Sequence, residues 1–268
     1  MVEKENTFSL EGTLRSKTKG LIINVSFCKL VYIFEAMSPI DFTKFLKTIS
    51  SEPLRVLNSS IPKSKYIPID LSESNQILNT VDISSSSKLD VIVNNHIKKH
   101  DALVAYGGYL EVRNLYKRSN HFNSQAEEER NIHLGFDLWC GAETPILTPL
   151  DGVVHSFKNN TNNGDYGPTI ILTHNISGVA FYTLYGHLSL ASINKLKVGK
   201  EFNKGEQIAT LGDTSVNGDY PPHLHFQIIK DIQDYNGDYP GVCSENDLGF
   251  YKGNCPDPSL LLGALGYV

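Results

Sequence analysis

The sequence predicts a mainly β protein, in which an antiparallel β-sheet core follows a smaller mixed α/β region. After about residue 100, short runs rich in Val, Ile, Tyr and Thr are separated by Gly, Asn, Asp and Pro at fairly regular intervals, which is typical of an antiparallel β domain. Before that point, apolar residues recur at helical spacing. We therefore divide the chain into an N-terminal region of unknown role, residues 1–100, and a β-sheet core domain, residues 101–268.

Local patterns place individual helices and strands along the chain. Ser38 precedes Pro39 and a run of apolar residues at helical spacing, which predicts a helix with Ser38 as its N-cap. A second helix is predicted to begin near Ser87, whose spacing to Asp90 is that of a capping box. Candidate strands of the core domain include Ala102–Tyr106, Gly152–Lys158, Thr169–His174, Ala180–Leu188, Gln207–Gly212 and His223–Lys230.

Charge and hydropathy exclude two classes of partner. The formal net charge is -5, and Lys and Arg are scattered rather than gathered in a stripe, so we expect no nucleic-acid partner. The apolar stretch Leu21–Phe34 is interrupted by Asn24 and Lys29 and is shorter than the roughly 20 residues of a membrane span, so no transmembrane segment is expected. No small-x-small cleavage site follows it, so no signal peptide is evident. Because Met37 opens a predicted helix, one hypothesis is that residues 1–36 are an over-extended start.

The cysteines argue against two kinds of stabilised fold. None of them forms a C-x-x-C pair, so neither a cysteine-rich zinc knuckle nor a disulfide scaffold is expected from Cys28, Cys140, Cys243 and Cys255. Cys243 and Cys255 could pair in an oxidising compartment or stay as thiols, and the sequence leaves both readings open.

Histidines carry the chemistry that the sequence indicates. His223 and His225 are two residues apart in a predicted strand, so both imidazoles point to one face while Leu224 and Phe226 enter the core. Two imidazoles on one face suit a metal site. With nine histidines in the chain, however, an H-x-H pair by chance has odds on the order of one in ten or more, so the pair alone is weak evidence.

Two further segments add to this pair. His133 and Asp137 are four residues apart, roughly 13 Å in an extended strand, which is long for two ligands of one zinc unless Gly135 bends the chain. His187 ends an aromatic strand in the sequence Tyr185-Gly186-His187-Leu188-Ser189, where a lone histidine is more often structural than catalytic. The order H-x-x-x-D, G-H-L-S and H-x-H, each in its own strand-like segment, is much rarer by chance than any one of the three.

With these motifs, residues 105–230 resemble the lysostaphin and LytM-type zinc endopeptidases, whose β-sheet core is called the duplicated hybrid motif. The segments Thr148–Val153 and Val198–Gly212 and the pair Asp257-Pro258 also resemble that family. By position, the resemblance implies that the zinc ligands are His133, Asp137 and His225 and that the non-ligand active-site histidines are His187 and His223. None of the five is substituted.

The resemblance implies a zinc-dependent metalloendopeptidase that hydrolyses peptide bonds in peptidoglycan cross-links or bridges, with one Zn²⁺ per chain and a periplasmic or extracellular location. The donor set agrees, because two imidazoles and one carboxylate leave a fourth position open, as in catalytic zinc sites. The chain has no H-E-x-x-H helix, so a histidine rather than a glutamate must take the proton from water. The sequence does not say which of His187 and His223 does so.

Two alternatives remain. A non-catalytic module on the same fold could bind a peptide or cell-wall fragment or act as an activator. The three unsubstituted zinc-ligand positions argue against this alternative. Val198–Gly212 also resembles the turns of lipoyl- and biotinyl-carrier domains, but carriers display a lysine between methionines, and the chain has only Met1 and Met37.

Other residues near the motifs have ordinary interpretations. Arg130, Trp139 and Tyr185 flank the motifs and could line a substrate cleft, with packing the favoured role for Trp139. The insertion 231–255 follows the H-x-H strand, and its tyrosines could shape that cleft or anchor the loop. Structural or solvated roles are expected for His96, His100, His121, His155 and His174.

Overall fold

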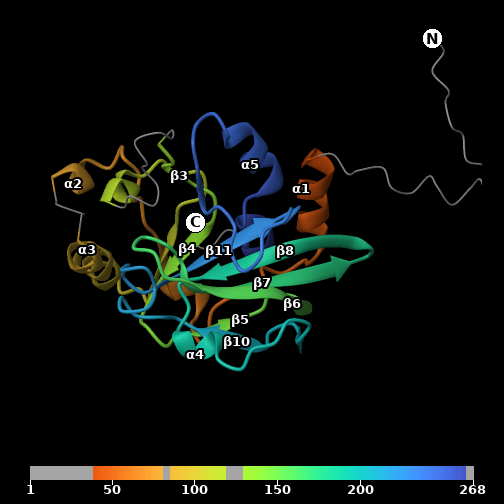
Figure 1. Ribbon diagram of the computed structural model, residues 1–268. Coiled ribbons are helices and arrows are strands. Elements are labelled where there is room, and N and C mark those ends of the chain that lie inside the picture. Colours follow the sequence, from red (N-terminus) through yellow and green to blue (C-terminus); the bar gives the residue numbers. More distant parts are fainter. Residues whose placement is uncertain (1–38, 81–84, 119–128, 264–268) are drawn as a thin grey trace, which may run out of the picture. The chain divides into compact units, whose positions relative to one another are not determined.

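An eight-stranded sheet, in the order β1-β2-β4-β11-β8-β7-β6-β9, organises the fold (Figure 1). The computed structural model describes residues 39–80, 85–118 and 129–263. Neighbouring strands of this sheet are antiparallel, apart from the parallel pair β1 and β2. The mainly β fold class predicted from the sequence is therefore confirmed. The strands of this sheet and of two smaller ones are β1 (Tyr66–Pro68), β2 (Val104–Gly107), β3 (Ile132–His133), β4 (Phe136–Trp139), β5 (Pro145–Leu147), β6 (Gly152–Asn160), β7 (Gly167–Ile176), β8 (Val179–Gly186), β9 (Glu201–Phe202), β10 (Gln207–Thr210), β11 (His223–Ile229) and β12 (Val242–Cys243).

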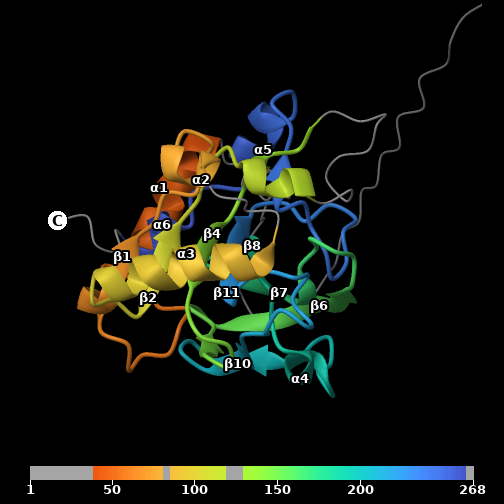
Figure 2. The ribbon, with the colours of Figure 1, turned by 90° about the vertical axis from the view of Figure 1, so that its left-hand side faces the viewer.

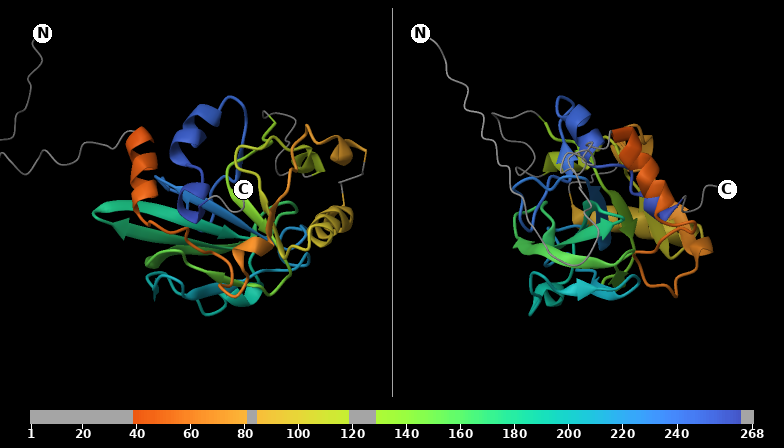
Figure 3. Two further views of the ribbon diagram at one scale, coloured as in Figure 1. Left: turned by 180° about the vertical axis from the view of Figure 1, so that it is seen from behind. Right: turned by 90° about the vertical axis from the view of Figure 1, so that its right-hand side faces the viewer.

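Short helices cover the sheet. Figure 2 shows α3 lying beside β2, and Figures 1 and 3 show α1 and α5 on one side of the sheet and α4 with the small β5–β10 sheet on the other. Among the described helices, none has both the length and the apolar character that a bilayer crossing requires. The helices are α1 (Pro39–Thr48), η2 (Lys63–Lys65), α2 (Gln76–Asn79), α3 (Ser86–Lys99), η3 (Asn114–Arg118), α4 (Leu190–Ile193), α5 (Leu248–Asn254) and α6 (Ser259–Leu262).

The start of α3 differs from the sequence prediction. Ser87 lies inside the first turn, Ser85 is the N-cap, and the Ser85 side chain makes no capping hydrogen bond, so the predicted capping box is wrong. The hydroxyl of Ser86 instead donates to Asp219 Oδ1 at 2.6 Å, which ties the helix start to a distant loop of the core domain. The first predicted helix is α1, and its proposed cap, Ser38, lies outside the described residues, as do residues 1–36.

The six candidate strands correspond to β2, β6, β7, β8, β10 and β11. Their ends shift by a few residues, and one shift matters for chemistry. β8 ends at Gly186, so His187 is not part of the strand as predicted. His187 has φ 63°, a left-handed conformation that breaks the strand and that non-glycine residues adopt rarely.

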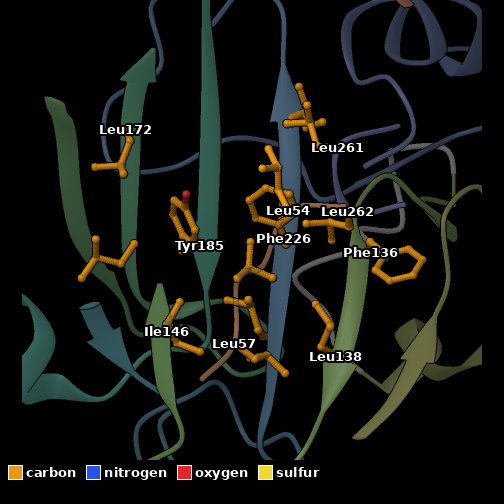
Figure 4. Packing of buried hydrophobic residues seen from close by; sticks show 14 of the residues in the cluster. Leu54, Leu57, Phe136, Leu138, Ile146, Leu172, Tyr185, Phe226, Leu261 and Leu262 are labelled. Atoms are coloured by element: carbon orange, nitrogen blue, oxygen red, sulfur yellow. The ribbon is translucent and has the colours of Figure 1, made fainter. Parts of the chain in front are cut away.

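A continuous apolar core lies against the sheet and includes residues from both sequence regions (Figure 4). Phe42 of α1 packs edge-on against Phe181 of β8, with ring centroids 5.9 Å apart. The change in residue composition near residue 100 coincides with the end of α3. Residues from both sides of that point pack in the same apolar cluster. Side chains of this cluster include Leu54, Leu57, Phe136, Leu138, Ile146, Leu172, Tyr185, Phe226, Leu261 and Leu262.

Candidate metal centre and active-site cavity

His133, Asp137 and His225 converge at the point where β3, β4 and β11 meet. β4 and β11 pair with Asp137 directly opposite His225, and β3 belongs to a separate two-stranded sheet with β12. Between His133 and Asp137 the chain passes from one sheet to another. The two residues are therefore not held apart by the roughly 13 Å of a continuous extended strand. One ligand atom from each of the three residues lies within 4.8 Å of the others. All three side chains are buried, at 2%, 1% and 2% exposure.

Gly135 makes this convergence possible by having no side chain. A Cβ at Gly135 would lie 2.4 Å from Cε1 and 2.5 Å from Nε2 of His225. The imidazole of His225 therefore rests directly against the backbone that joins His133 to Asp137. The sequence predicted Gly135 as a bend, and the structure adds close approach as the reason for glycine at this position.

Hydrogen bonds at the outer nitrogens determine which ring atoms face the site. Nδ1–H of His133 donates to the carbonyl oxygen of Gly108 at 2.9 Å. Nε2–H of His225 donates to Oε1 of Gln227 at 2.9 Å, and the Gln227 amide is oriented by its own donation to Pro240 O. In the neutral rings, Nε2 of His133 and Nδ1 of His225 are therefore both unprotonated acceptors.

These two acceptor nitrogens face each other at 2.9 Å, and each lies 3.3 Å from Oδ1 of Asp137. Oδ1 is fully buried and has no hydrogen-bond partner. Three acceptors directed at one another without a proton repel, whereas a cation between them would satisfy all three. The residues present therefore fit a bound metal ion, and the set of two imidazoles and one carboxylate is that of catalytic zinc.

The electrostatics favour a neutral imidazole at His133 and an ionised carboxylate at Asp137. Burial lowers the pKa of His133 to about 4. Burial alone would raise the pKa of the Asp137 carboxyl, but the neighbouring His133 and the Arg113 guanidinium reverse that effect, and the pKa lies well below its usual value. Near neutral pH these are the protonation states that metal ligation requires.

His187 and His223 lie beside this group, and the ring of each is held by a hydrogen bond from Nδ1–H to a backbone oxygen. Nδ1–H of His223 donates to Pro221 O at 2.8 Å, and Nδ1–H of His187 donates to Asn217 O at 2.8 Å. Their ring centroids are 4.2 Å apart. Burial lowers the pKa of His223 to about 4, and burial together with its histidine neighbours lowers the pKa of His187 well below its usual value. Both Nε2 atoms are thus unprotonated and able to accept a proton.

All five histidine and aspartate side chains line one cavity of about 200 Å³. Trp139 and Arg130 also line it, with Trp139 stacked on His223 at a centroid distance of 3.9 Å. Tyr185 does not, because it faces the core from β8 and its hydroxyl accepts from Thr183, so the prediction that it lines a cleft is wrong. The insertion 231–255 forms part of the wall with Tyr235, Asp238, Tyr239, Pro240, Gly241 and Val242.

Several residues at the site were missed from the sequence. Gln227 could have been found, because it is two residues beyond His225 and the strand period places it on the same face. Tyr166 and Tyr220 line the cavity, and no pattern distinguishes them from the other tyrosines. Arg113, whose Nη1 donates to Oδ2 of Asp137 at 2.6 Å, lies 24 residues before its partner and has no motif.

The other histidines and cysteines among the described residues lie outside this group. His96 and His100 contact the backbone oxygens of Pro68 and His96, and His155 contacts Ser156. His174 is buried and bonded to Asp151 O and Thr183 Oγ1. His121 lies outside the described residues, as does Cys28. Free thiols are present at Cys140, Cys243 and Cys255.

The buried imidazoles predict a pH dependence of the metal-free fold. His133, His174 and His223 each have a pKa of about 4 in the folded chain against 6.5 for an exposed histidine. Between these values the unfolded chain binds protons that the folded chain does not, so the free energy of unfolding should fall as pH falls. We expect a loss of roughly 1–2 kcal/mol for each of these imidazoles between pH 6.5 and pH 5.

Urea unfolding in the presence of a chelator at the two pH values measures this loss. The variant His174→Gln, which leaves the cavity intact, should remove the contribution of one imidazole from this loss. A free energy of unfolding that is constant over this interval would contradict the assignment of neutral buried rings.

Comparison with known proteins agrees with the geometry. Residues 131–237 match the model of peptidase family M23. An uncharacterized metalloprotease of Haemophilus influenzae is 34% identical over 95 residues, which are 35% of this chain and 18% of that protein. The peptidoglycan DD-endopeptidase ShyA of Vibrio cholerae is 34% identical over 98 residues, which are 36% of this chain and 20% of that protein. The chain thus matches about a fifth of the length of these curated relatives.

Solved structures of similar proteins include a zinc-containing peptidase from Vibrio cholerae, 27% identical, covering 37% of this chain and 27% of that one, with a TM-score of 0.30. They also include the catalytic domain of lysostaphin from Staphylococcus simulans, 24% identical, covering 46% of this chain and 80% of that one, with a TM-score of 0.31. The family match begins two residues before His133 and ends after His225, so it spans all five residues of the site. Residues 131–237 of this chain are thus similar to peptidase family M23.

Proposed function

We propose that this chain is a zinc-dependent metalloendopeptidase that hydrolyses peptide bonds in peptidoglycan cross-links or bridges, outside the cytoplasm. The observation that carries the proposal is the convergence of three buried acceptor atoms, Nε2 of His133, Oδ1 of Asp137 and Nδ1 of His225, with no proton to separate them. A relative named as a peptidoglycan DD-endopeptidase supports the substrate class.

These three atoms would hold one Zn²⁺. When bound in such a site, zinc lowers the pKa of a water molecule to about 7 and polarises the carbonyl of the scissile bond. The outer hydrogen bonds to Gly108 and Gln227 hold the two imidazoles in the tautomers that ligation needs.

His187 and His223 would perform the proton transfers. Each presents an unprotonated Nε2 to the cavity while its Nδ1–H is held by a backbone oxygen. One Nε2 accepts the proton of the attacking water, and a histidine then returns a proton to the leaving amine. Burial of both rings keeps bulk water from them and keeps them neutral until that step. Trp139, stacked on His223, restrains the orientation of that ring.

Zinc content and hydrolysis test the proposal together. Purified protein should contain about one zinc per chain and should release peptides from purified peptidoglycan. A chelator should abolish that release, and added zinc should restore it. The same chelator should lower the melting temperature, because a ligand that binds only the folded chain stabilises it.

Two results would contradict the proposal. Zinc-replete protein that cleaves no peptidoglycan or peptide substrate would favour a non-catalytic binding or activator module on the same fold. Cleavage that survives complete removal of metal would exclude the zinc-dependent reaction.

A further inference from the structure

Residues 108–113 connect β2 to η3 and contact two of the candidate zinc ligands. They precede the family match, which begins at residue 131. The carbonyl of Gly108 accepts from Nδ1 of His133, and Arg113 donates to Asp137. A Cβ at Gly108 would lie 2.0 Å from Nη2 of Arg113 and 3.0 Å from Nδ1 of His133. The absence of a side chain at Gly108 therefore allows its carbonyl to reach His133 and allows Arg113 to reach Asp137.

Arg113 is buried at 2% exposure and sits between two carboxylates. Its Nη1 donates to Oδ2 of Asp137 at 2.6 Å, and its Nε donates to Oε2 of Glu111 at 2.5 Å. Nη1 also lies 3.3 Å from the hydroxyl of Tyr116. Burying a guanidinium is costly unless it is paired and fully hydrogen-bonded. Here the two carboxylates and the tyrosine hydroxyl provide hydrogen-bond partners for Nε and Nη1 of Arg113.

Glu111 is held in turn by the N-terminal region. Its Oε1 accepts from the backbone N–H of Leu71 at 2.9 Å, and the N–H of Glu73 donates to the carbonyl of Val112. Leu71 and Glu73 lie in the loop that follows β1, and β1 pairs with β2 in the main sheet. A chain of contacts thus runs from Leu71 through Glu111 and Arg113 to Asp137.

This chain of contacts determines how Asp137 can act as a ligand. A carboxylate has two equivalent oxygens, and a free one can rotate or offer both. Because Arg113 occupies Oδ2, only Oδ1 is directed to the point where the acceptor nitrogens of His133 and His225 meet. Glu111 balances the charge of Arg113, so the guanidinium does not neutralise the carboxylate that it orients.

We propose that Glu111 and Arg113 are positioning residues that hold Asp137 as a one-oxygen zinc ligand, and that the segment from Leu71 to Arg113 thereby completes a metal site whose ligands all lie in the family domain. This inference rests on the proposed function. It gives the region before residue 131 a part in zinc retention.

Zinc affinity in folded protein tests the inference. Arg113→Lys keeps the charge but loses the fork that contacts both carboxylates, and Glu111→Gln keeps the shape but removes the balancing charge. We expect each variant to bind zinc 10–100-fold more weakly than wild type in competition with a chelator. We also expect the visible absorption of the cobalt(II)-substituted protein to change, since the carboxylate is then free to alter its binding mode.

A matched control separates positioning from general stability. His174→Gln breaks buried hydrogen bonds to Asp151 O and Thr183 Oγ1 but does not touch the cavity. It should lower the melting temperature of the chelated protein while leaving zinc affinity and the cobalt spectrum as in wild type. If Arg113→Lys does not fold, Glu111→Gln carries the test.

Folded Arg113→Lys and Glu111→Gln proteins that bind zinc within twofold of wild type would overturn the inference and leave the proposed function standing. Wild-type protein that binds no zinc would overturn both. The two failures are therefore distinguishable in one set of titrations.

Discussion

Replacing His225 by alanine is expected to remove zinc and peptidase activity together, whereas replacing His187 by alanine is expected to leave zinc in place and remove only turnover. Nδ1 of His225 is one of the three converging acceptors, within 4.8 Å of the other two ligand atoms. The loss of zinc affinity in His225→Ala should exceed the 10–100-fold typical of outer contacts. His187 contributes no atom to that group, and the loss of a general acid or base typically costs 10²–10⁴-fold in rate.

The measurement is zinc per chain after dialysis, paired with kcat and KM on purified peptidoglycan or a peptide derived from it. His174→Ala provides the control for removing a buried imidazole away from the cavity, and it should keep both zinc and kcat. Release of zinc by His187→Ala would show that the division between ligands and proton-transfer residues is wrong.

Replacing Gly135 by alanine is the second change with a large expected effect, although it removes no functional group. The new Cβ would lie 2.4 Å from Cε1 of His225, closer than real Cβ contacts come, so the ring or the backbone must move. Any such movement takes Nδ1 of His225 away from Nε2 of His133 and Oδ1 of Asp137. A displacement of about 1 Å at a catalytic group can cost 10²-fold in rate, so we expect a fall in kcat/KM of at least about that size together with weaker zinc binding.

Gly141→Ala is the matched control, because a Cβ there meets no atom within 4 Å. Both variants should retain the far-ultraviolet circular dichroism of wild type. If Gly135→Ala bound zinc as tightly as Gly141→Ala and turned over at the same rate, the close approach of His225 to that backbone would be unimportant for the site.

Part of the site could be predicted from sequence because it depends on the geometry of a single strand. The alternation of side chains along a strand is a local property, so His223 and His225 could be assigned to one face, and the structure has both lining the cavity from β11. The same rule would have found Gln227. Turn residues and β-branched runs are also local, and they predicted the six strands to within a few residues.

Features that depend on contacts between distant segments could not be predicted in this way. The N-cap of α3 was misplaced by two residues, and the prediction also missed the bond from Ser86 to Asp219, 133 residues away. His187 was assigned to a strand that ends at Gly186, because its left-handed backbone is not encoded by its residue type. Tyr185 was a candidate for lining the cleft because it flanks a histidine motif, but it faces the core.

By itself, the sequence determined the mainly β class, six of the strands and the shared face of His223 and His225, because periodicity is a property of short segments. The full set of four candidate histidines and one aspartate came from the resemblance to a known family. Only the tertiary structure decided that His133 and Asp137 approach from two different sheets, that Gly135 yields its side-chain space to His225, and that Arg113 orients the carboxylate. Each of these is a packing or electrostatic contact between segments far apart along the chain, and such contacts exist only once the sheets have formed.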